Sequence, residues 1–190
     1  MQTSGGRKNR FTAKRLALMA VFVALSYAVS FLETPPIAGF LRLDFGNVFI
    51  LLISLLLGPI EGVIVCLLKE GLRCLTSTTF CIGELANFVI TSSFILLPSI
   101  LYRYKKGIKV VILSLICGCL IGTGAALLMN RFVLLPWFFE AGFIPVPAKE
   151  MFGEIWWILL LFNLVKCVLI SVIVFLLYKR LSNFLKRWEQ

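Results

Sequence analysis

Long apolar runs separated by short polar segments cover nearly the whole 190-residue chain. Six of these runs are predicted to be helices, at about 13–32, 45–57, 60–75, 84–101, 110–129 and 153–178. A helix that crosses the hydrocarbon layer of a bilayer needs about 20 predominantly apolar residues, with a usual range of roughly 17–25. The pattern therefore predicts an all-α integral membrane protein, a bundle of six transmembrane helices.

The second run is too short to cross a bilayer unaided. A helix of about thirteen residues rises only about 20 Å, whereas the hydrocarbon layer is about 30 Å thick. We therefore expect neighbouring helices to shield it. The preceding stretch, 38–46, is apolar enough to fold back into the bundle. Irregular backbone at that depth is tolerated only against protein or a cavity, so a loop covering an internal cavity would satisfy the requirement.

Composition and charge strengthen this picture. Hydrophobic residues make up 60% of the chain and charged residues 15%, against about 45–50% and about 25% in soluble domains. The net charge is +10, and the cations cluster before the first run, between the fourth and fifth runs, and after the last. This clustering is typical of the cytoplasmic ends of membrane helices and argues against nucleic-acid binding.

Six helices with this charge pattern predict that both termini are cytoplasmic. The segments 33–44, 76–83 and 130–152 are then the outer loops. Three parts of the chain are expected: a disordered basic tail at 1–12, a six-helix substrate-binding domain at 13–182, and a basic C-terminal tail at 183–190.

The sequence lacks the usual signs of enzyme chemistry. It has no His, the usual general base near neutral pH, and no G-x-x-x-x-G-K-[ST] loop for nucleotide phosphates. Cys117 and Cys119 have no second pair at zinc spacing, so we expect no metal site. Cys74 and Cys81 can meet near one membrane face, but two free thiols are the expected state.

Polar side chains inside apolar runs are costly in hydrocarbon and therefore indicate a site. Asn163 and Lys166 are three residues apart in the last run, so they share a helix face. Lys166 lies about twelve residues from either end of the run, too deep for its amine to reach water easily. A buried polar pair that fixes helix packing is one interpretation. A ligand site is favoured, because Lys166 has no acidic neighbour on its own helix.

Other polar residues lie close to the ends of runs. The amide of Asn130, after the fifth run, offers donors and acceptors, although a helix C-cap is the alternative. Glu84 and Asn87 open the fourth run on one face, and Glu84 can equally stabilise the helix N-terminus. Lys69 and Glu70 interrupt the third run and can pair with Glu84 or with a ligand.

The first run carries small residues at helical spacing, Ala20, Ala24 and Ala28. Such a stripe lets another helix approach closely. The partner can be a helix of this chain or one of another protein, and the sequence alone leaves both interpretations open.

An ordered set of short motifs runs along nearly the whole chain. It comprises Leu43-Asp44-Phe45, Gly58-Pro59 with Gly62, Glu84-Leu85-Ala86-Asn87-Phe88, Asn130 with Pro136, and Phe162-Asn163-x-x-Lys166. Together with the six-helix pattern, this set resembles the riboflavin-specific S component of energy-coupling factor (ECF) vitamin transporters.

The resemblance implies a multi-pass protein of a bacterial cell membrane that binds riboflavin near its outer face, under the first outer loop. The implied substrate-binding residues are Asn130, Asn163, Lys166, Leu43, Asp44, Phe45, Glu84 and Asn87. The alanine stripe would dock onto a transmembrane T component coupled to two ATPase subunits. That partnership would also explain the missing nucleotide motif. No cofactor is implied, since riboflavin is the transported ligand.

Three residues depart from the family pattern. Arg131 stands where an aromatic residue is expected, Asn47 where a second acid is expected, and Cys167 where glycine is expected. Arg131 would lie near the outer mouth, where it can meet the phosphate of FMN. The alternatives are an S component for another vitamin and a membrane scaffold protein without transport function.

Overall fold

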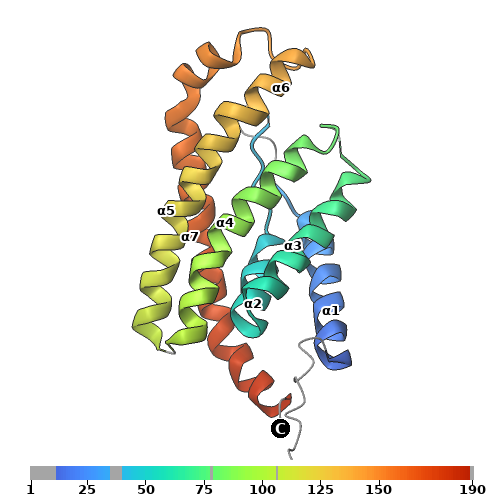
Figure 1. Cartoon of the computed structure of the whole chain (residues 1–190), viewed down its shortest axis with the longest axis vertical. Helices are drawn as coiled ribbons and strands as arrows, with labels where there is room; N and C mark the ends of the chain where they lie inside the picture. The colour runs from blue at the N-terminus through green and yellow to red at the C-terminus, as the bar shows by residue number, and fades with distance from the viewer. Residues whose placement is uncertain (1–11, 35–39, 78, 106, 189–190) are drawn as a thin grey trace, which may run out of the picture.

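The computed structural model describes residues 12–34, 40–77, 79–105 and 107–188. Within these residues the chain forms helices and no β-strand. The helices are α1 (Ala13–Ser30), α2 (Asn47–Leu57), α3 (Pro59–Cys74), α4 (Ile82–Tyr104), α5 (Ile108–Met129), the π-helix η1 (Asn130–Leu134), α6 (Leu135–Glu140) and α7 (Ala148–Trp188). They form an elongated bundle (Figure 1). The predicted all-α class is confirmed.

The six apolar runs all become helices, but one predicted loop is wrong. Residues 130–152 do not form an extended outer loop, because α5 continues through η1 into α6 and a connection of only 141–147 precedes α7. Pro136 lies in the first turn of α6, where its missing N–H breaks no helical hydrogen bond. Asn130 follows the last residue of α5 with right-handed helical backbone angles, and the helix continues through η1, so Asn130 is not a left-handed cap that stops the helix.

The helices differ in their capacity to cross a membrane. Four are long and apolar enough: Ala13–Ser30, Ile82–Tyr104, the continuous Ile108–Glu140, and Ala148–Leu177. Helix α2 has 11 residues and α3 has 16. Eight of the α2 residues are buried, so neighbouring helices enclose it. The expectation that the second run needs shielding is confirmed.

The junction of α2 and α3 depends on one glycine. Gly58 has a φ of +134°, a backbone conformation that residues with a Cβ rarely adopt. The next residue, Pro59, begins α3, a position where proline is favoured. Gly58-Pro59 therefore ends one helix and starts the next without an intervening loop.

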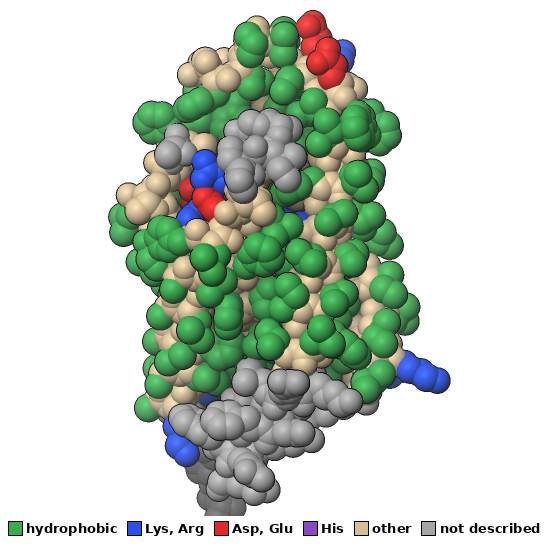
Figure 2. All heavy atoms as spheres, turned by 180° about the vertical axis from the view of Figure 1, so that it is seen from behind, with side chains coloured by type: hydrophobic (Ala, Val, Ile, Leu, Met, Phe, Trp, Pro, Cys, Tyr) green, Lys and Arg blue, Asp and Glu red, His purple; other side chains and the backbone are tan. Residues whose placement is uncertain are grey.

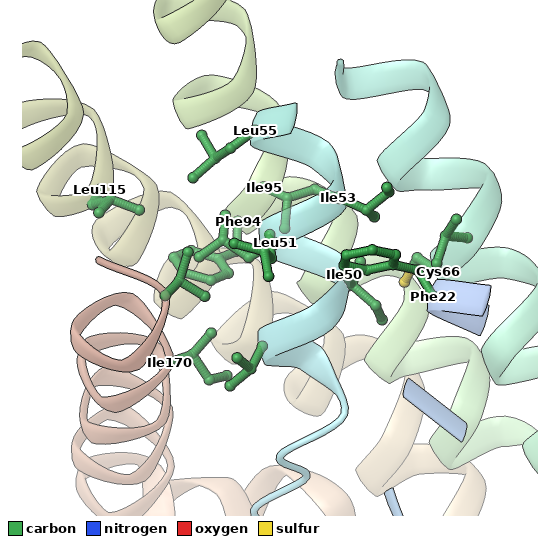
Figure 3. Close-up of a cluster of buried hydrophobic side chains, with 14 of the residues drawn as sticks. Phe22, Ile50, Leu51, Ile53, Leu55, Cys66, Phe94, Ile95, Leu115 and Ile170 are labelled. Carbon is green, nitrogen blue, oxygen red and sulfur yellow. The ribbon is translucent and has the colours of Figure 1, made fainter. Parts of the chain in front are cut away.

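Helix α2 lies at the centre of the main apolar core (Figure 3). Its residues Ile50, Leu51 and Ile53 pack among side chains from all the surrounding helices, including Phe22 of α1, Cys66 of α3, Phe94 of α4, Leu115 of α5 and Ile170 of α7. Lipid tails are as apolar as these side chains, so close van der Waals packing rather than water exclusion holds such helices together. Small residues allow it, since a Cβ on Gly118 would lie 2.8 Å from the carbonyl oxygen of Phe94.

The outer surface is largely apolar. Figure 2 shows hydrophobic side chains over most of one face, with charged side chains near its ends and in one opening close to one end. Large exposed residues of α5 and α7 include Leu113, Leu120 and Val165. An exposed apolar surface of this extent indicates contact with lipid.

The connections are sorted between the two ends of the bundle. The α1–α2, α3–α4 and α6–α7 connections lie toward one end, while the start of α1, the α4–α5 connection and the end of α7 lie at the other (Figure 1). The predicted N-terminal tail, 1–12, lies outside the described residues except for its last residue. In the predicted C-terminal tail, α7 stays helical to Trp188.

Candidate functional site

A cluster of buried charges lies where the segment before α2 meets α3. The ammonium of Lys69 forms ion pairs with Asp44 and, at 2.6 Å, with Glu70. The Lys69 side chain is 0% exposed. Burying an ion is costly unless opposite charges and hydrogen bonds compensate it. The two carboxylates supply that compensation.

An amide on α4 extends the cluster to the last helix. Asn87 donates to the carboxylate of Glu70 through its Nδ2. Its Oδ1 accepts a hydrogen bond of 2.9 Å from Lys166 and a long one of 3.5 Å from the amide of Asn47. Polar side chains from α2, α3, α4 and α7 thus meet inside the bundle. With two lysines and two carboxylates, the formal charges of the cluster cancel.

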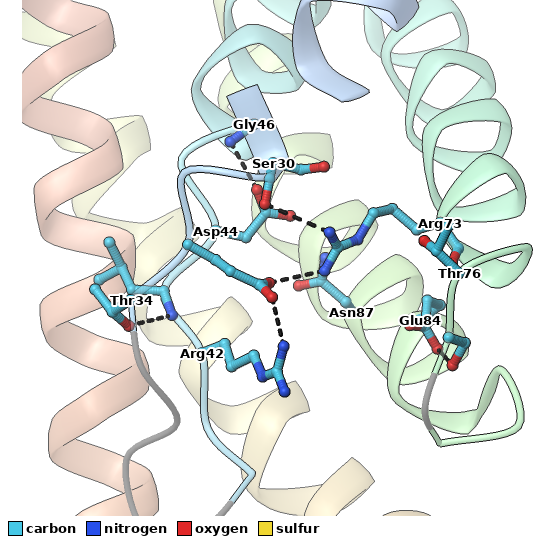
Figure 4. A network of polar contacts seen from close by, with 12 residues as sticks. Ser30, Thr34, Arg42, Asp44, Gly46, Arg73, Thr76, Glu84 and Asn87 are labelled. Carbon is cyan, nitrogen blue, oxygen red and sulfur yellow. Dashed lines mark hydrogen bonds and ion pairs between the residues drawn. The ribbon is translucent and has the colours of Figure 1, made fainter. Parts of the chain in front are cut away.

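The segment before α2 is fixed over this cluster by its own contacts (Figure 4). Asp44 accepts a hydrogen bond of 2.7 Å from the backbone N–H of Gly46, and the carbonyl of Gly46 accepts one of 2.8 Å from Ser26. Position 46 must be glycine, because a Cβ there would collide with the backbone oxygen of Ser26. This segment also contains Leu43, which is buried, and Phe45, which is half-buried.

A second set of ion pairs lies nearer the end of the bundle. Arg73 of α3 contacts the carboxylate of Glu33 at 2.7 Å, and Arg42 contacts the same carboxylate at 2.5 Å. Arg73 also donates to the carbonyl of Ser30 at 3.5 Å (Figure 4). Glu33 follows α1 and Arg42 precedes α2, so these contacts tie both ends of the α1–α2 connection to α3.

The structure brings together three of the predicted site residues, Asp44, Asn87 and Lys166. Asn163 is buried one turn before Lys166 on α7, and its Nδ2 donates to the carbonyl of Leu159 at 2.8 Å. Asn130 is 2% exposed and donates to the carbonyl of Ala126 at 2.7 Å. Within the described part of the chain, the Oδ1 of Asn130 has no hydrogen-bond partner.

Glu84 lies apart from the cluster. Its carboxylate accepts hydrogen bonds from Ser77 at 2.7 Å and from Thr79 at 3.4 Å. Both hydroxyls belong to the α3–α4 connection. The contacts of Glu84 in the structure therefore organise that connection.

Sequence signals for the Lys69 cluster are weak. The adjacent Lys69 and Glu70 in an apolar run indicated a buried partner, but the partners proposed were Glu84 or a ligand. The structure pairs them with Asp44 and Asn87 rather than with Glu84. Asp44 is 25 residues from Lys69, and only the folding back of the segment before α2 brings the two together.

The expectation of two free thiols at Cys74 and Cys81 is wrong, because they form a disulfide. The turn between α3 and α4 brings their Cα atoms to 5.0 Å, within the usual range of about 4.4–6.8 Å for disulfides. No group of three or more His, Cys, Asp or Glu in the described ranges can hold a metal ion.

Three further residues that the chemistry of a site could use lie at the surface. Trp156 and Trp157 are exposed, as expected for aromatic side chains at a membrane interface. Arg131 is also exposed, and its guanidinium lies 5.2 Å from the ring centroid of Phe152. It lines an open hollow together with Lys149.

Fold and site together define a class of protein: a helical membrane bundle that holds polar groups in its interior, as proteins that bind polar solutes within the membrane do. Comparisons with known proteins identify the family. Residues 14–178 match the model of the family described as "ECF transporter, substrate-specific component". The chain belongs to this family.

Relatives that align over nearly their whole length support the same family assignment. The chain is 34% identical over 187 residues to the riboflavin transporter RibU of Staphylococcus aureus (strain TCH60), covering 97% of this chain and 99% of that protein. It is 23% identical over 182 residues to the riboflavin transporter FmnP of Bacillus subtilis (strain 168), covering 92% and 95%. These relatives are transporters, which confirms the prediction of a transport component rather than an enzyme.

A solved structure shows the same fold. The structure described as "Structure and mechanism of the S component of a bacterial ECF transporter" superposes with a TM-score of 0.74 at 33% identity. The match covers 91% of this chain and 98% of that one. The resemblance drawn from the motifs is therefore confirmed at the level of the family.

Proposed function

We propose that this chain is the riboflavin-binding subunit of an ATP-driven ECF vitamin importer. The observation that carries the proposal is the 34% identity, over nearly the whole of both chains, to a riboflavin transporter. The buried polar cluster around Lys166 and Asn87 supplies the chemistry that such a ligand requires.

The groups around Lys166 suit a flavin. The isoalloxazine ring is flat and mostly apolar with one polar edge, and the ribityl tail carries hydroxyls. A pocket for it needs apolar walls and a few placed polar groups. Leu43 and Phe45 are the proposed walls. Lys166, Asn163 and Asn130 are the proposed hydrogen-bonding residues, since each is buried and has hydrogen-bonding capacity beyond its present contacts.

Energy for uptake must come from a partner in this proposal, and α1 offers the surface. Ala20, Ala24 and Ala28 are all exposed, while the opposite face of α1 buries Phe22 and Ser26. The stripe is therefore not used for packing among the described residues of this chain. A transmembrane T component coupled to two ATPase subunits is the proposed partner.

The proposed arrangement is a multi-pass protein of a bacterial cell membrane, with residues 13–182 as the six-helix binding domain. Both termini face the cytoplasm, in keeping with the clustered cations. The α1–α2, α3–α4 and α6–α7 connections, which share one end of the bundle, face outward. Riboflavin then enters beneath the α1–α2 connection and is delivered inward.

A direct test is flavin binding by the purified protein in detergent. We expect a yellow preparation with flavin absorbance near one equivalent, and quenching of riboflavin fluorescence on titration into stripped protein. Competition with FMN and with other vitamins separates the alternatives. Displacement by a different vitamin alone would indicate an S component of other specificity, and no binding of any of them would favour the scaffold interpretation.

The docking surface is tested by Ala24→Trp. The large ring should prevent close approach of a partner helix, so uptake by cells carrying the whole importer should fall to background while riboflavin affinity stays within about twofold. Leu120→Trp is the matched control, because Leu120 is 64% exposed on α5, away from the stripe. Uptake that survives in Ala24→Trp would place the partner elsewhere.

A further inference from the structure

Asn47 occupies a buried position beside the polar cluster. It is the first residue of α2 and only 1% exposed, and the residues that follow it, such as Val48 and Leu51, belong to the apolar core. Its amide nitrogen donates to the Oδ1 of Asn87 at 3.5 Å, the outer limit of a hydrogen bond. Asn87 also holds Lys166, so Asn47 lies one contact from the proposed ligand-binding lysine.

The hydrogen-bonding capacity of Asn47 is largely unused. Its Oδ1 is buried and has no hydrogen-bond partner among the described residues. Leaving a buried acceptor unpaired costs about 1–3 kcal/mol, and buried polar atoms in folded proteins are nearly always paired. An unpaired acceptor beside a weakly held donor, on one side chain next to a ligand site, indicates groups kept available for a ligand.

The chemistry of a carboxamide identifies the part of the ligand. A carboxamide presents an acceptor and a donor side by side. The polar edge of an isoalloxazine ring is a cyclic imide, a ring N–H flanked by two carbonyls, so the two groups are complementary. Asn47 lies where the polar cluster meets the apolar residues of α2, such as Val48 and Leu51, a boundary that suits the polar edge of a flat apolar ring.

We propose that Asn47 reads the imide edge of the flavin, its Oδ1 accepting from the ring N–H and its Nδ2 donating to the adjacent ring carbonyl. This inference rests on the proposed riboflavin-binding function. In the complex, the long contact to Asn87 is exchanged for the ligand carbonyl, and Asn47 becomes a specificity-determining residue for uncharged cyclic imides.

The charge of the cluster explains why an amide suits this position. Lys69 and Lys166 are balanced by Asp44 and Glu70, so an acid at position 47 would add an uncompensated negative charge. An ionised carboxylate also has no donor for the ring carbonyl. The neutral amide keeps the cluster balanced and reads both groups of the imide.

The test is a double-mutant cycle, in which one change is made in the protein and the other in the ligand, and the four binding affinities are compared. Affinities of the full-length wild type and of Asn47→Ala are measured in detergent for riboflavin and for its N3-methyl derivative, which lacks the ring N–H. We expect Asn47→Ala to weaken riboflavin binding by roughly tenfold or more, as for the loss of a ligand hydrogen bond. Binding of the N3-methyl derivative should weaken clearly less, because only the bond from Nδ2 to the ring carbonyl is left to lose and the smaller side chain leaves room for the methyl group.

Ser92→Ala is the control, since the Ser92 hydroxyl is likewise buried but takes no part in the hydrogen bonds and ion pairs that link Asn47, Asn87, Glu70, Lys69 and Lys166. It should leave both affinities unchanged. Equal losses for both ligands in Asn47→Ala, or no loss for riboflavin, would overturn the role of Asn47 alone. Failure of wild-type protein to bind riboflavin would overturn the proposed function and this inference with it.

Discussion

Two lysines are buried inside this bundle, and their surroundings differ. Lys69 on α3 contacts two carboxylates, Asp44 and Glu70. Lys166 on α7 is 7% exposed, and its hydrogen bond within the described structure is to one neutral amide oxygen, that of Asn87. An ammonium has three donors, so Lys166 has donors left for a ligand, whereas Lys69 is neutralised by the protein itself.

The two lysines show that a buried charge can either stabilise the structure or remain available for a ligand. The Lys69 region joins α3 to the segment before α2 and therefore shapes the site. The Lys166 region supplies an ammonium that donates a hydrogen bond to Asn87 and has further donors that a ligand can use. Burial alone does not distinguish the two lysines, but the count of charged partners does.

The largest effect is expected for Lys69→Met. Removing Lys69 takes from Asp44 and Glu70 the ammonium that contacts both of them, and breaking a buried ion pair in this way typically costs about 3–5 kcal/mol. We expect a large fall in the thermal unfolding temperature of the ligand-free protein in detergent. Lys166→Met is the matched control, and its unfolding temperature should fall less, because Lys166 contacts a neutral amide whereas Lys69 contacts both carboxylates directly. Equal falls would remove the distinction between the two lysines.

Lys166→Ala should instead act on binding. A hydrogen bond from a charged group contributes about 1.5–3 kcal/mol, so riboflavin affinity should drop by roughly 10- to 150-fold with little change in unfolding temperature. Asn163→Ala removes a neutral group and should cost less, about 2- to 10-fold. Lys149→Ala, an exposed lysine on the same helix, serves as the control. Affinities unchanged in both variants, measured by fluorescence titration, would move the site elsewhere.

The sequence predicted the helices well because their signals are local. Apolar runs set the helix positions, and Gly58-Pro59 marked a helix junction that needs only neighbouring residues. Contacts between residues far apart in the sequence were missed, because local signals do not record them. The contact of Asp44 with Lys69 depends on how an irregular segment folds back, which no periodicity records.

The region after α5 shows a second limit. The positions of the apolar runs predict an outer loop at 130–152, yet the π-helical turn Asn130–Leu134 carries the helix on to Glu140. A π-helical turn inside a longer helix is rare, so local propensity does not predict it. The proposed roles of Asn130 and Asn163 in binding stay predictions, since both amides donate to their own helices.

The smallest change in stability is expected for variants of the ion pairs nearer the end of the bundle. Arg73 and Glu33 are partly exposed, with side chains 16% and 17% accessible, and such pairs contribute about 0–1 kcal/mol. Arg73→Gln should therefore leave the unfolding temperature nearly unchanged. Because the pair fastens the α1–α2 connection over the site, riboflavin should dissociate a few times faster from this variant.

Salt provides the internal check on that prediction. Added salt screens partly exposed charges, so the difference in dissociation rate between wild type and Arg73→Gln should shrink from low to high ionic strength in stopped-flow measurements. Arg42→Gln removes a more exposed partner of the same carboxylate and should have a smaller effect. A salt-independent acceleration in Arg73→Gln would mean that its packing near Phe31, rather than its charge, holds the connection in place.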